Sequence, residues 1–251
     1  MFDLTGRVVV VTGANRGIGL GIARGVAEAG ADVVVWGRDE QRNAAAVADL
    51  ERFGRRVLAL RCDVGDEDQV VEAFARSVDA MGRVDCLFAN AGVSGFSPFV
   101  DMTLQEWRRV QRVNLDGAFL SLREAARHLV DRGEGGSLVA ISSVSAVDGA
   151  PGMEHYAASK GALLALMRGL AVELARHQVR CNTILPGWTE TDMLSPMAAN
   201  QKFVDNTIKR TPARRWGAPS DLAPVAVFLA DPTNTFHTGD TLVVDGGYSI
   251  F

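Results

Sequence analysis

Short apolar runs alternate with longer helical stretches along the whole chain of 251 residues. The apolar runs are continuous in Val, Ile and Leu, which is the pattern of strands that are buried on both faces. We expect strands at Val8–Val11, Val33–Trp36, Val57–Arg61, Cys86–Ala89, Leu138–Ser142, Arg180–Leu185 and Leu242–Val244. We expect helices at about Ile18–Ala29, Gln41–Phe53, Glu67–Met81, Leu104–Val130, Ala157–His177 and Ser220–Ala230.

This order of elements predicts an α/β fold, a Rossmann-type, doubly wound, seven-stranded parallel sheet with helices on both faces. The length fits a single domain of residues 1–251 better than two small ones. Between Pro186 and Trp216 the pattern is broken by prolines. A broken segment after a strand is where a substrate lid would lie in such a sheet, so we predict a lid at about 187–216. A surface excursion without a role is the alternative.

The charge and the cysteines narrow the class of protein. A net charge of −4 gives no basic surface for nucleic acid, and no apolar run approaches the roughly 20 residues of a membrane span. The N-terminus enters a strand-like run almost at once, which leaves no room for a signal peptide. The three cysteines are odd in number and lack CxxC spacing, so we expect reduced thiols, no metal site and a cytoplasmic location.

A glycine-rich loop follows the first predicted strand and opens the first predicted helix. Glycines allow the chain to turn sharply and bring backbone N–H groups close to a pyrophosphate. The spacing is G-x-x-x-G-x-G, and a lone glycine motif also marks ordinary turns. Because strand, loop and helix occur here in the required order, the loop predicts a dinucleotide site. Its expected cofactor-binding residues are Gly13, Asn15, Arg16, Gly17, Ile18 and Gly19.

The end of the second predicted strand bears on which dinucleotide is bound. An acidic residue there would hydrogen-bond the ribose 2′-hydroxyl of NAD, but Gly37 occupies this place and Arg38 follows it. Arg38 and Arg16 together could bind a 2′-phosphate, although each could also be an ordinary surface charge. Asp39 lies at about the distance from Gly19 expected of the NAD-binding acid. The pattern favours NADP(H) and leaves NAD(H) open.

Tyr156 and Lys160 lie four residues apart at the start of a predicted helix, so they share one face. Tyrosine is a poor proton donor near neutral pH, and a nearby ammonium favours its phenolate and lowers its pKa. The chain has 23 arginines but only three lysines, and it places one of these lysines here. Arginine would keep its charge but could not take part in a proton relay. The pair predicts an acid–base site with Tyr156 as the proton donor.

Two further polar positions remain open on sequence grounds. Ser142 and Ser143 end the fifth predicted strand, where ligands bind in open α/β sheets, but a serine pair also starts turns. Asn114 lies inside an apolar helical stretch, which is a costly place for an amide unless it bonds a backbone group, a water or a partner residue.

These residues resemble the short-chain dehydrogenase/reductase family over nearly the full length, from Gly6 to Gly247. The matching motifs are Thr12-Gly-x-x-x-Gly17-x-Gly19, Cys62-Asp63-Val64, Asn90-Ala91-Gly92, Asn114, Ile141-Ser-Ser143, Tyr156-Ala-Ala-Ser159-Lys160, Asn182, Pro186-Gly187 with Thr191, and Val244-Asp-Gly-Gly247. Several independent motifs in the right order make the resemblance specific. It is about equally good to 3-oxoacyl-carrier-protein reductases and to sugar or polyol dehydrogenases.

The resemblance implies catalytic roles. Ser143 matches the catalytic serine of the family better than Ser142 does. Tyr156 would be the general acid in reduction and the general base in oxidation. Lys160 would bind the nicotinamide ribose and lower the pKa of the tyrosine, and Asn114 would hold a water that links Lys160 to solvent.

The resemblance also implies further cofactor contacts. Asp63 and Val64 would meet the adenine, Asn90 the adjoining ribose, and Thr191 the phosphates or the carboxamide. The other cofactor-binding residues that it implies are Ala91, Gly92, Pro186, Gly187 and Thr189. Thr189 departs from the Ile or Val that is common in the family, and Gln178 stands where a helix-ending glycine is common, which would cost a little stability.

The expected substrate wall comprises Ser94, Phe96, Ser145, Val147, Met153, Trp188 and Met193. It favours a hydrophobic or acyl-type ketone only mildly, because Trp188 could equally well pack the lid. The sequence therefore predicts an NADP(H)-dependent oxidoreductase acting on a small-molecule carbonyl or secondary alcohol. The alternatives are an NAD-dependent alcohol or polyol dehydrogenase and, more remotely, a non-catalytic dinucleotide sensor. The resemblance also implies a homo-oligomer, a dimer or a tetramer, formed through Leu104–Val130 and Ala157–His177.

Overall fold

The computed structural model describes residues 2–251 and contains a seven-stranded sheet in the order β3-β2-β1-β4-β5-β6-β7. Every neighbouring pair of strands is parallel. The strands are β1 (Val8–Thr12), β2 (Asp32–Gly37), β3 (Val57–Arg61), β4 (Cys86–Ala89), β5 (Gly136–Ile141), β6 (Val179–Pro186) and β7 (Thr241–Val244). The predicted fold class and all seven predicted strands are confirmed. The strand order reverses between β1 and β4, which is where such sheets bind ligands.

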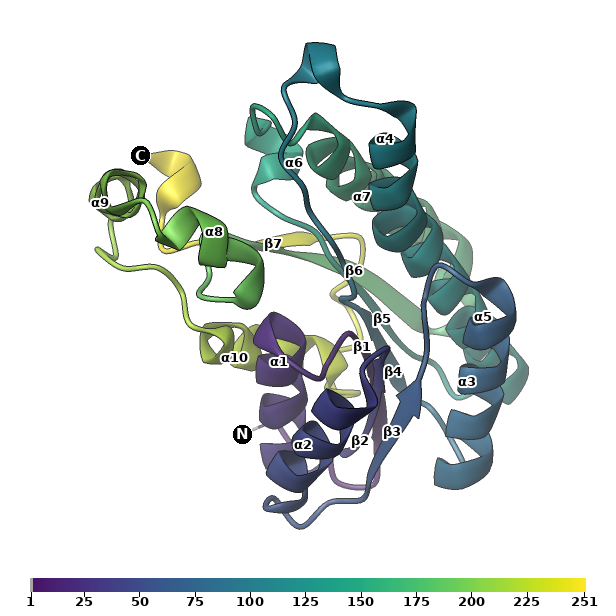
Figure 1. The fold of residues 1–251 in the computed structure, drawn as a ribbon. Helices are drawn as coiled ribbons and strands as arrows, with labels where there is room; N and C mark the ends of the chain where they lie inside the picture. Colours follow the sequence, from purple (N-terminus) through teal and green to yellow (C-terminus); the bar gives the residue numbers. More distant parts are fainter. Residues whose placement is uncertain (1) are drawn as a thin grey trace.

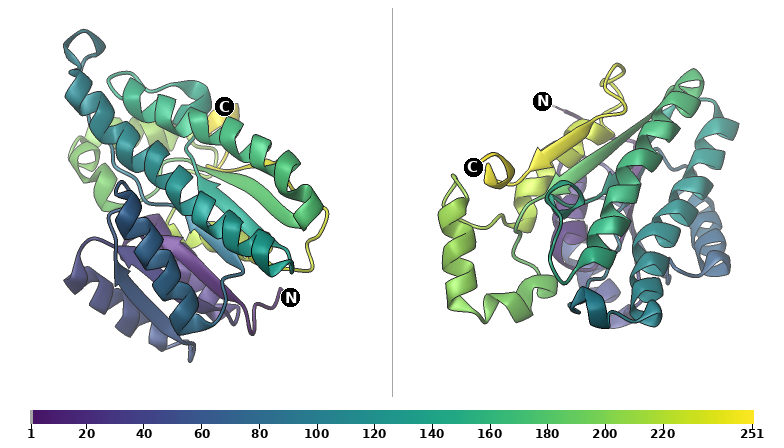
Figure 2. Two further views of the ribbon diagram at one scale, coloured as in Figure 1. Left: turned by 90° about the vertical axis from the view of Figure 1, so that its right-hand side faces the viewer. Right: turned by 90° about the horizontal axis from the view of Figure 1, so that it is seen from above.

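Helices cover both faces of the sheet (Figure 1). One face carries α1 (Gly17–Glu28), α2 (Glu40–Glu51) and α10 (Ala223–Ala230). The other carries α3 (Glu67–Met81), α4 (Leu104–Gln111), α5 (Gly117–Arg132) and α7 (Glu154–Leu174), of which Figure 2 shows the long helices side by side. Outside these layers are α6 (Ser145–Asp148), α8 (Ser195–Ala198) and α9 (Gln201–Arg210), and α9 lies beside the C-terminal turn.

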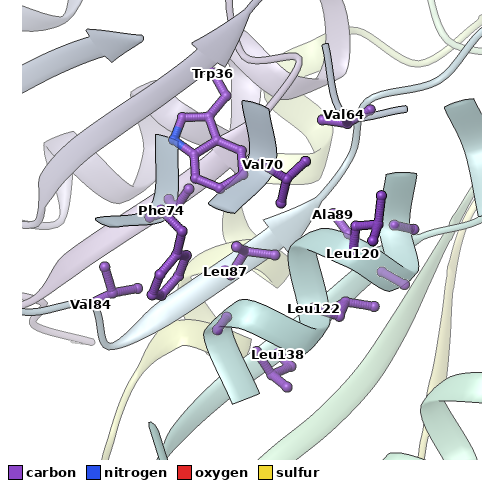
Figure 3. Packing of buried hydrophobic residues seen from close by; sticks show 14 of the residues in the cluster. Trp36, Val64, Val70, Phe74, Val84, Leu87, Ala89, Leu120, Leu122 and Leu138 are labelled. Atoms are coloured by element: carbon purple, nitrogen blue, oxygen red, sulfur yellow. The ribbon is translucent and has the colours of Figure 1, made fainter. Parts of the chain in front are cut away.

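The sheet divides the core into two clusters because successive side chains of a strand point to opposite faces. In β1, Val8 and Val10 belong to one cluster, whereas Val9 and Val11 belong to the other. The first cluster is shown in Figure 3, where Trp36 lies above Phe74. Trp36 is fully buried, and its indole N–H donates to Ser77 Oγ at 3.1 Å, which removes the cost of burying that group.

Two helix predictions differ from the structure, and one helix was not predicted. The predicted helix Leu104–Val130 is interrupted between α4 and α5 by a π-helical turn, Arg112–Asp116, with Asn114 at its centre. The predicted helix Ser220–Ala230 starts as a 3-10 turn, Pro219–Leu222, because prolines lie in its first turns. The irregular segment 187–216 contains an unpredicted amphipathic helix, α9, which Asn200 caps by accepting the Phe203 N–H at 3.2 Å.

The connection from α7 to β6 passes through a left-handed residue. A 3-10 turn, Ala175–His177, closes the helix, and Gln178 follows with φ 59°. A side chain is disfavoured in this conformation, which agrees with the small stability cost that the sequence predicts at this position.

None of the helices formed by residues 2–251 combines the length and the apolar character that crossing a membrane requires.

Candidate active site

A cleft of about 740 Å³ lies at the carboxyl ends of the strands. All predicted site residues except Asn114 and Val147 line it, among them Gly13, Asn15, Arg16, Gly17, Ile18, Gly19, Arg38, Asp63, Val64, Asn90, Ala91, Gly92, Ser94, Ser143, Ser145, Met153, Tyr156, Lys160, Pro186, Gly187, Trp188, Thr189, Thr191 and Met193. Phe96 also lines the cleft, but Val147 does not, and its side chain is exposed. The parallel sheet thus brings together residues that are up to 180 positions apart, because the loops after its strands open at one edge.

The glycine loop after β1 lies close to Asn90 and Ala91, which follow the neighbouring strand β4. A Cβ on Gly19 would lie 2.5 Å from Asn90 Nδ2, and one on Gly13 would lie 3.0 Å from the Cα of Ala91. Asn90 Nδ2 donates to the Thr12 carbonyl at 2.8 Å, so this side chain fastens the loop. Only glycine allows this approach of the two loops.

The loop leads into a helix whose first turn has no side-chain cap, because its N-cap residue is Arg16. Uncapped backbone N–H groups at a helix N-terminus, together with the helix dipole, favour an anion such as a pyrophosphate. The cleft is lined by Gly17, Ile18 and Gly19 of this turn. The residues therefore fit the phosphates of a dinucleotide.

Position 37 has no room for a side chain. A Cβ on Gly37 would lie 2.4 Å from both Asn15 Nδ2 and Asn43 Oδ1, which are hydrogen-bonded to each other at 2.8 Å. Asn43 Nδ2 also donates to the Gly37 carbonyl at 2.9 Å. An acidic residue that would select NAD is absent here, and a side chain at this position would have to displace the hydrogen-bonded amides of Asn15 and Asn43.

The alternative acid, Asp39, is engaged in helix capping. Its Oδ1 accepts the Arg42 N–H at 3.0 Å and caps α2. Asp39 does not line the cleft, whereas Arg16 and Arg38 do. The adenosine end of the cleft therefore offers guanidinium groups instead of a free carboxylate. Asp63, the predicted adenine contact, pairs with Arg112 at 3.1 Å.

Three of the four predicted catalytic residues, Ser143, Tyr156 and Lys160, line the cleft together. Tyr156 and Lys160 share one face of the first turns of α7, and Ser143 follows β5. Ser143 Oγ lies 2.6 Å from Ser145 Oγ. Burial raises the pKa of Tyr156, and its hydrogen bond with Ser143 opposes this increase. The phenol is therefore protonated at neutral pH.

Lys160 is buried, and its ammonium is bound to the main chain. Its Nζ donates to the Ile141 carbonyl at 2.7 Å and lies 5.8 Å from the centroid of the Tyr156 ring. Burial lowers the pKa of Lys160 itself to about 8. In this arrangement burial of the phenol prevails in the pKa of Tyr156, and the ammonium is bound to a carbonyl. That Lys160 lowers the tyrosine pKa stays a prediction.

Asn114 lies behind the cleft and is fully buried in the π-helical turn. Its amide bonds the main chain of Val93 and donates to Ser159 Oγ at 3.0 Å. A Cβ on Gly92 would lie 3.4 Å from Asn114 Oδ1 and 3.5 Å from Lys160 Nζ, so these two groups flank the same point. Sequence reasoning required backbone or side-chain partners for this amide, and the structure supplies both kinds.

Aromatic side chains form the end of the cleft where the sequence predicts the substrate. Trp188 packs edge-on against Phe203 and Tyr248, with ring centroids 5.1 and 6.1 Å away, and stacks on Trp216 at 6.4 Å. Arg210 lies over the Tyr248 ring, 4.2 Å from its centroid.

Three residues of this wall were missed by sequence reasoning: Phe203, Arg210 and Tyr248. The first two lie on the unpredicted helix α9. Tyr248 comes directly after the Val244-Asp-Gly-Gly247 motif. Its place beside this motif was the one sequence signal that could have indicated Tyr248 as a site residue.

A family model described as "Enoyl-(Acyl carrier protein) reductase" matches residues 13–249. The chain is 39% identical to an L-rhamnose 1-dehydrogenase (NAD(P)(+)) of Sphingomonas sp., covering 97% of this chain and 96% of the relative. It is 36% identical to a 3-oxoacyl-(acyl-carrier-protein) reductase of Chlamydia pneumoniae, covering 97% of each. A crystal structure of a gluconate 5-dehydrogenase from Burkholderia cenocepacia in complex with NADP and tartrate superposes with a TM-score of 0.94, with 37% identity over 99% of this chain and 97% of that one. With its cleft, glycine loop and Ser143, Tyr156 and Lys160, the chain belongs to the short-chain dehydrogenase/reductase family.

Proposed function

We propose that the protein interconverts a ketone and a secondary alcohol with NADP(H). The observation that carries this proposal is the single cleft lined both by the uncapped N-terminus of α1 and by Ser143, Tyr156 and Lys160. A bound nicotinamide supplies or accepts the hydride. The protein residues handle the proton and hold the reacting oxygen.

In reduction, Tyr156 is the general acid. Its raised pKa keeps the phenol protonated, so the phenol can give its proton to the oxygen that forms the alcohol. Ser143 Oγ donates a hydrogen bond to the same oxygen and holds it beside the phenol.

Lys160 then returns a proton toward the tyrosine. With a pKa of about 8 its ammonium can release a proton near neutral pH, which an arginine could not do. Asn114 Oδ1 and Lys160 Nζ lie on either side of Gly92, so Asn114 orients the water that passes the proton between Lys160 and solvent.

The cofactor is proposed to be NADP(H). The support is that a crowded glycine stands at position 37 in place of an acidic residue and that Asp39 is engaged as a helix cap, while Arg16 and Arg38 line the cleft. Titration with NADPH and NADH tests this. If NADPH bound no more tightly than NADH, and Arg38→Ala changed neither, the cofactor proposal would be wrong and the NAD-dependent alternative would be favoured.

The substrate is proposed to be a polyhydroxylated sugar or sugar acid. Dehydrogenases of rhamnose and gluconate are among the relatives, and Arg210 provides a cation at the substrate end that can pair with a carboxylate. A β-keto acyl thioester is the second candidate, and the aromatic wall of Trp188, Phe203 and Tyr248 favours it.

A panel of ketones and alcohols from both classes, followed by NADPH absorbance, tests the activity and the substrate class together. We expect turnover with the sugar class. Turnover only with acyl ketones would refute the sugar class. Binding of both cofactors without turnover of any substrate would indicate the non-catalytic sensor.

The segment after β6 is proposed to be the substrate lid. It leaves the sheet at Trp188 and returns at Gly217, where Gly217 N donates to the Trp188 carbonyl at 2.8 Å. This hydrogen bond joins the two ends of the loop, so the loop can move as one piece.

We also propose a cytoplasmic location and a homo-oligomer, a dimer or tetramer built through α5 and α7, which expose Phe119 and Val172. Sedimentation showing a monomer would refute the assembly.

A further inference from the structure

A carboxylate at the rim of the cleft joins two arginines near its adenosine end. Asp192 Oδ2 lies 3.0 Å from Arg16 Nη1 and 3.3 Å from Arg42 Nη1. Arg16 belongs to the glycine loop, Arg42 to the first turn of α2, and Asp192 to the segment after β6. Thr191 packs against the same loop, since its methyl carbon lies 3.2 Å from where a Cβ of Gly17 would be.

The two arginines differ in their other partners. Arg42 also pairs with Asp39 at 3.6 Å. Within residues 2–251, Asp192 supplies the one carboxylate that lies within 4 Å of the Arg16 guanidinium. Arg16 and Asp192 both line the cleft, and their side chains are 53% and 61% exposed, so a ligand anion can reach the same guanidinium.

The charge of the ligand decides whether the ion pair between Arg16 and Asp192 persists when the cofactor binds. A 2′-phosphate carries more charge than one carboxylate and accepts two parallel hydrogen bonds from a guanidinium, so it can take Arg16 from Asp192. The 2′-hydroxyl of NAD(H) has no such charge and leaves the pair intact. Each exposed ion pair contributes little, so the exchange is readily reversible.

We propose that Asp192 is a cofactor-specificity residue that competes with the 2′-phosphate of NADP(H) for Arg16. Asp192 thereby weakens the binding of NADP(H) and has little effect on NAD(H). Because Asp192 lies near the start of the proposed lid, binding of NADP(H) also breaks this ion pair between the lid and the glycine loop. The inference rests on the proposed use of NADP(H) by this site.

Calorimetric titration of the full chain with NADP⁺ and with NAD⁺ tests the competition. The variants are Asp192→Asn, which keeps the shape and removes the charge, and Glu190→Gln as the matched control. Glu190 is exposed on the same segment, two residues earlier, and forms no ion pair with the described residues. We expect Asp192→Asn to bind NADP⁺ roughly 2- to 10-fold more tightly, with NAD⁺ affinity unchanged, and Glu190→Gln to change neither.

Three results would overturn the competition. NADP⁺ affinity that stays the same or falls in Asp192→Asn would mean that Asp192 does not compete, or that it orients Arg16 for the phosphate. Equal tightening of both cofactors would indicate general access to the cleft. Equal tightening in Glu190→Gln would indicate unspecific charge repulsion. If the unmodified protein binds NAD⁺ more tightly than NADP⁺, the proposed cofactor fails, but the comparison between variants still decides the role of Asp192.

Discussion

The side-chain amide of Asn114 exchanges two hydrogen bonds with the main chain of Val93. Its Oδ1 accepts the Val93 N–H at 2.8 Å, and its Nδ2 donates to the Val93 carbonyl at 2.9 Å. Val93 lies in the loop after β4 and lines the cleft. A residue in a π-helical turn therefore fixes the wall of the site, which is a use to which such turns are often put.

Asn114→Ala should destabilise the protein by roughly 2–4 kcal/mol, because it removes a fully buried amide and leaves both main-chain polar groups of the half-buried Val93 without this partner. Ser159→Ala is the control that leaves the Val93 bonds in place: it removes the hydrogen bond from Asn114 to Ser159 Oγ and the one that Ser159 Oγ donates to the Tyr156 carbonyl. Urea unfolding of both variants measures the difference. Equal losses in the two variants would contradict the role of the Val93 bonds.

Tyr156→Phe should lower kcat by about 10²- to 10⁴-fold, because the general acid is lost while the ring still packs in its place. The affinity for NADPH should stay within about twofold, which a fluorescence titration measures. Residual kcat above about a tenth of the original value would rule out Tyr156 as the acid–base residue.

Lys160 should make the stability depend on pH in a definite direction. Its pKa falls from 10.5 to about 8 on folding because it is buried. Between these two values the unfolded chain binds more protons than the folded one, so the free energy of unfolding rises with pH in this window. The gain should be on the order of 2–3 kcal/mol, since one pKa unit corresponds to roughly 1.4 kcal/mol.

The comparison for this prediction is Lys160→Met, which lacks the titrating group. Urea unfolding at pH 7.5 and at pH 10 should show the unmodified protein gaining stability relative to the variant. A difference that does not change with pH would mean that Lys160 has an ordinary pKa in the folded state.

Gln178→Gly should stabilise the protein by up to about 1 kcal/mol. Gln178 has φ 59° at the end of the 3-10 turn after α7, a conformation that glycine adopts without a steric penalty. Its side chain makes no hydrogen bond to the described residues, so its loss should cost little. A lower melting temperature in this variant would show that the packing of the glutamine matters more than its backbone.

Gly37→Ala should destabilise the protein by more than about 1 kcal/mol, because its Cβ would lie 2.4 Å from Asn15 and Asn43. Gly169→Ala is the control: this glycine lies within α7 with no atom near its Cβ position, so alanine should be neutral or stabilising by roughly 0.5–1 kcal/mol. Thermal unfolding measures both. If Gly37→Ala were as stable as the original protein, position 37 could hold a side chain, and the crowding at Gly37 would no longer argue for NADP(H) over NAD(H).

The sequence predicted most of the fold because its signals are local. Continuous apolar runs locate strands that are buried on both faces, as in Val33–Trp36, and all seven were found. The break at Arg112–Asp116 was not predicted, because the apolar pattern continues through it and it contains no proline or glycine, although Gly117 follows it directly. The helix Gln201–Arg210 was missed because it is short and lies in a segment dominated by prolines and loops.

By itself the sequence determined the elements whose chemistry is written in neighbouring residues: the glycine loop at Gly13–Gly19, and Tyr156 with Lys160 one helical turn later. Only the tertiary structure decided what these groups face. It turned Lys160 toward Ile141, 19 residues away, brought Arg210 onto Tyr248, 38 residues away, and paired Arg16 with Asp192, 176 residues away. Such partners depend on how the loops at the sheet edge pack against one another, and no local pattern encodes that packing.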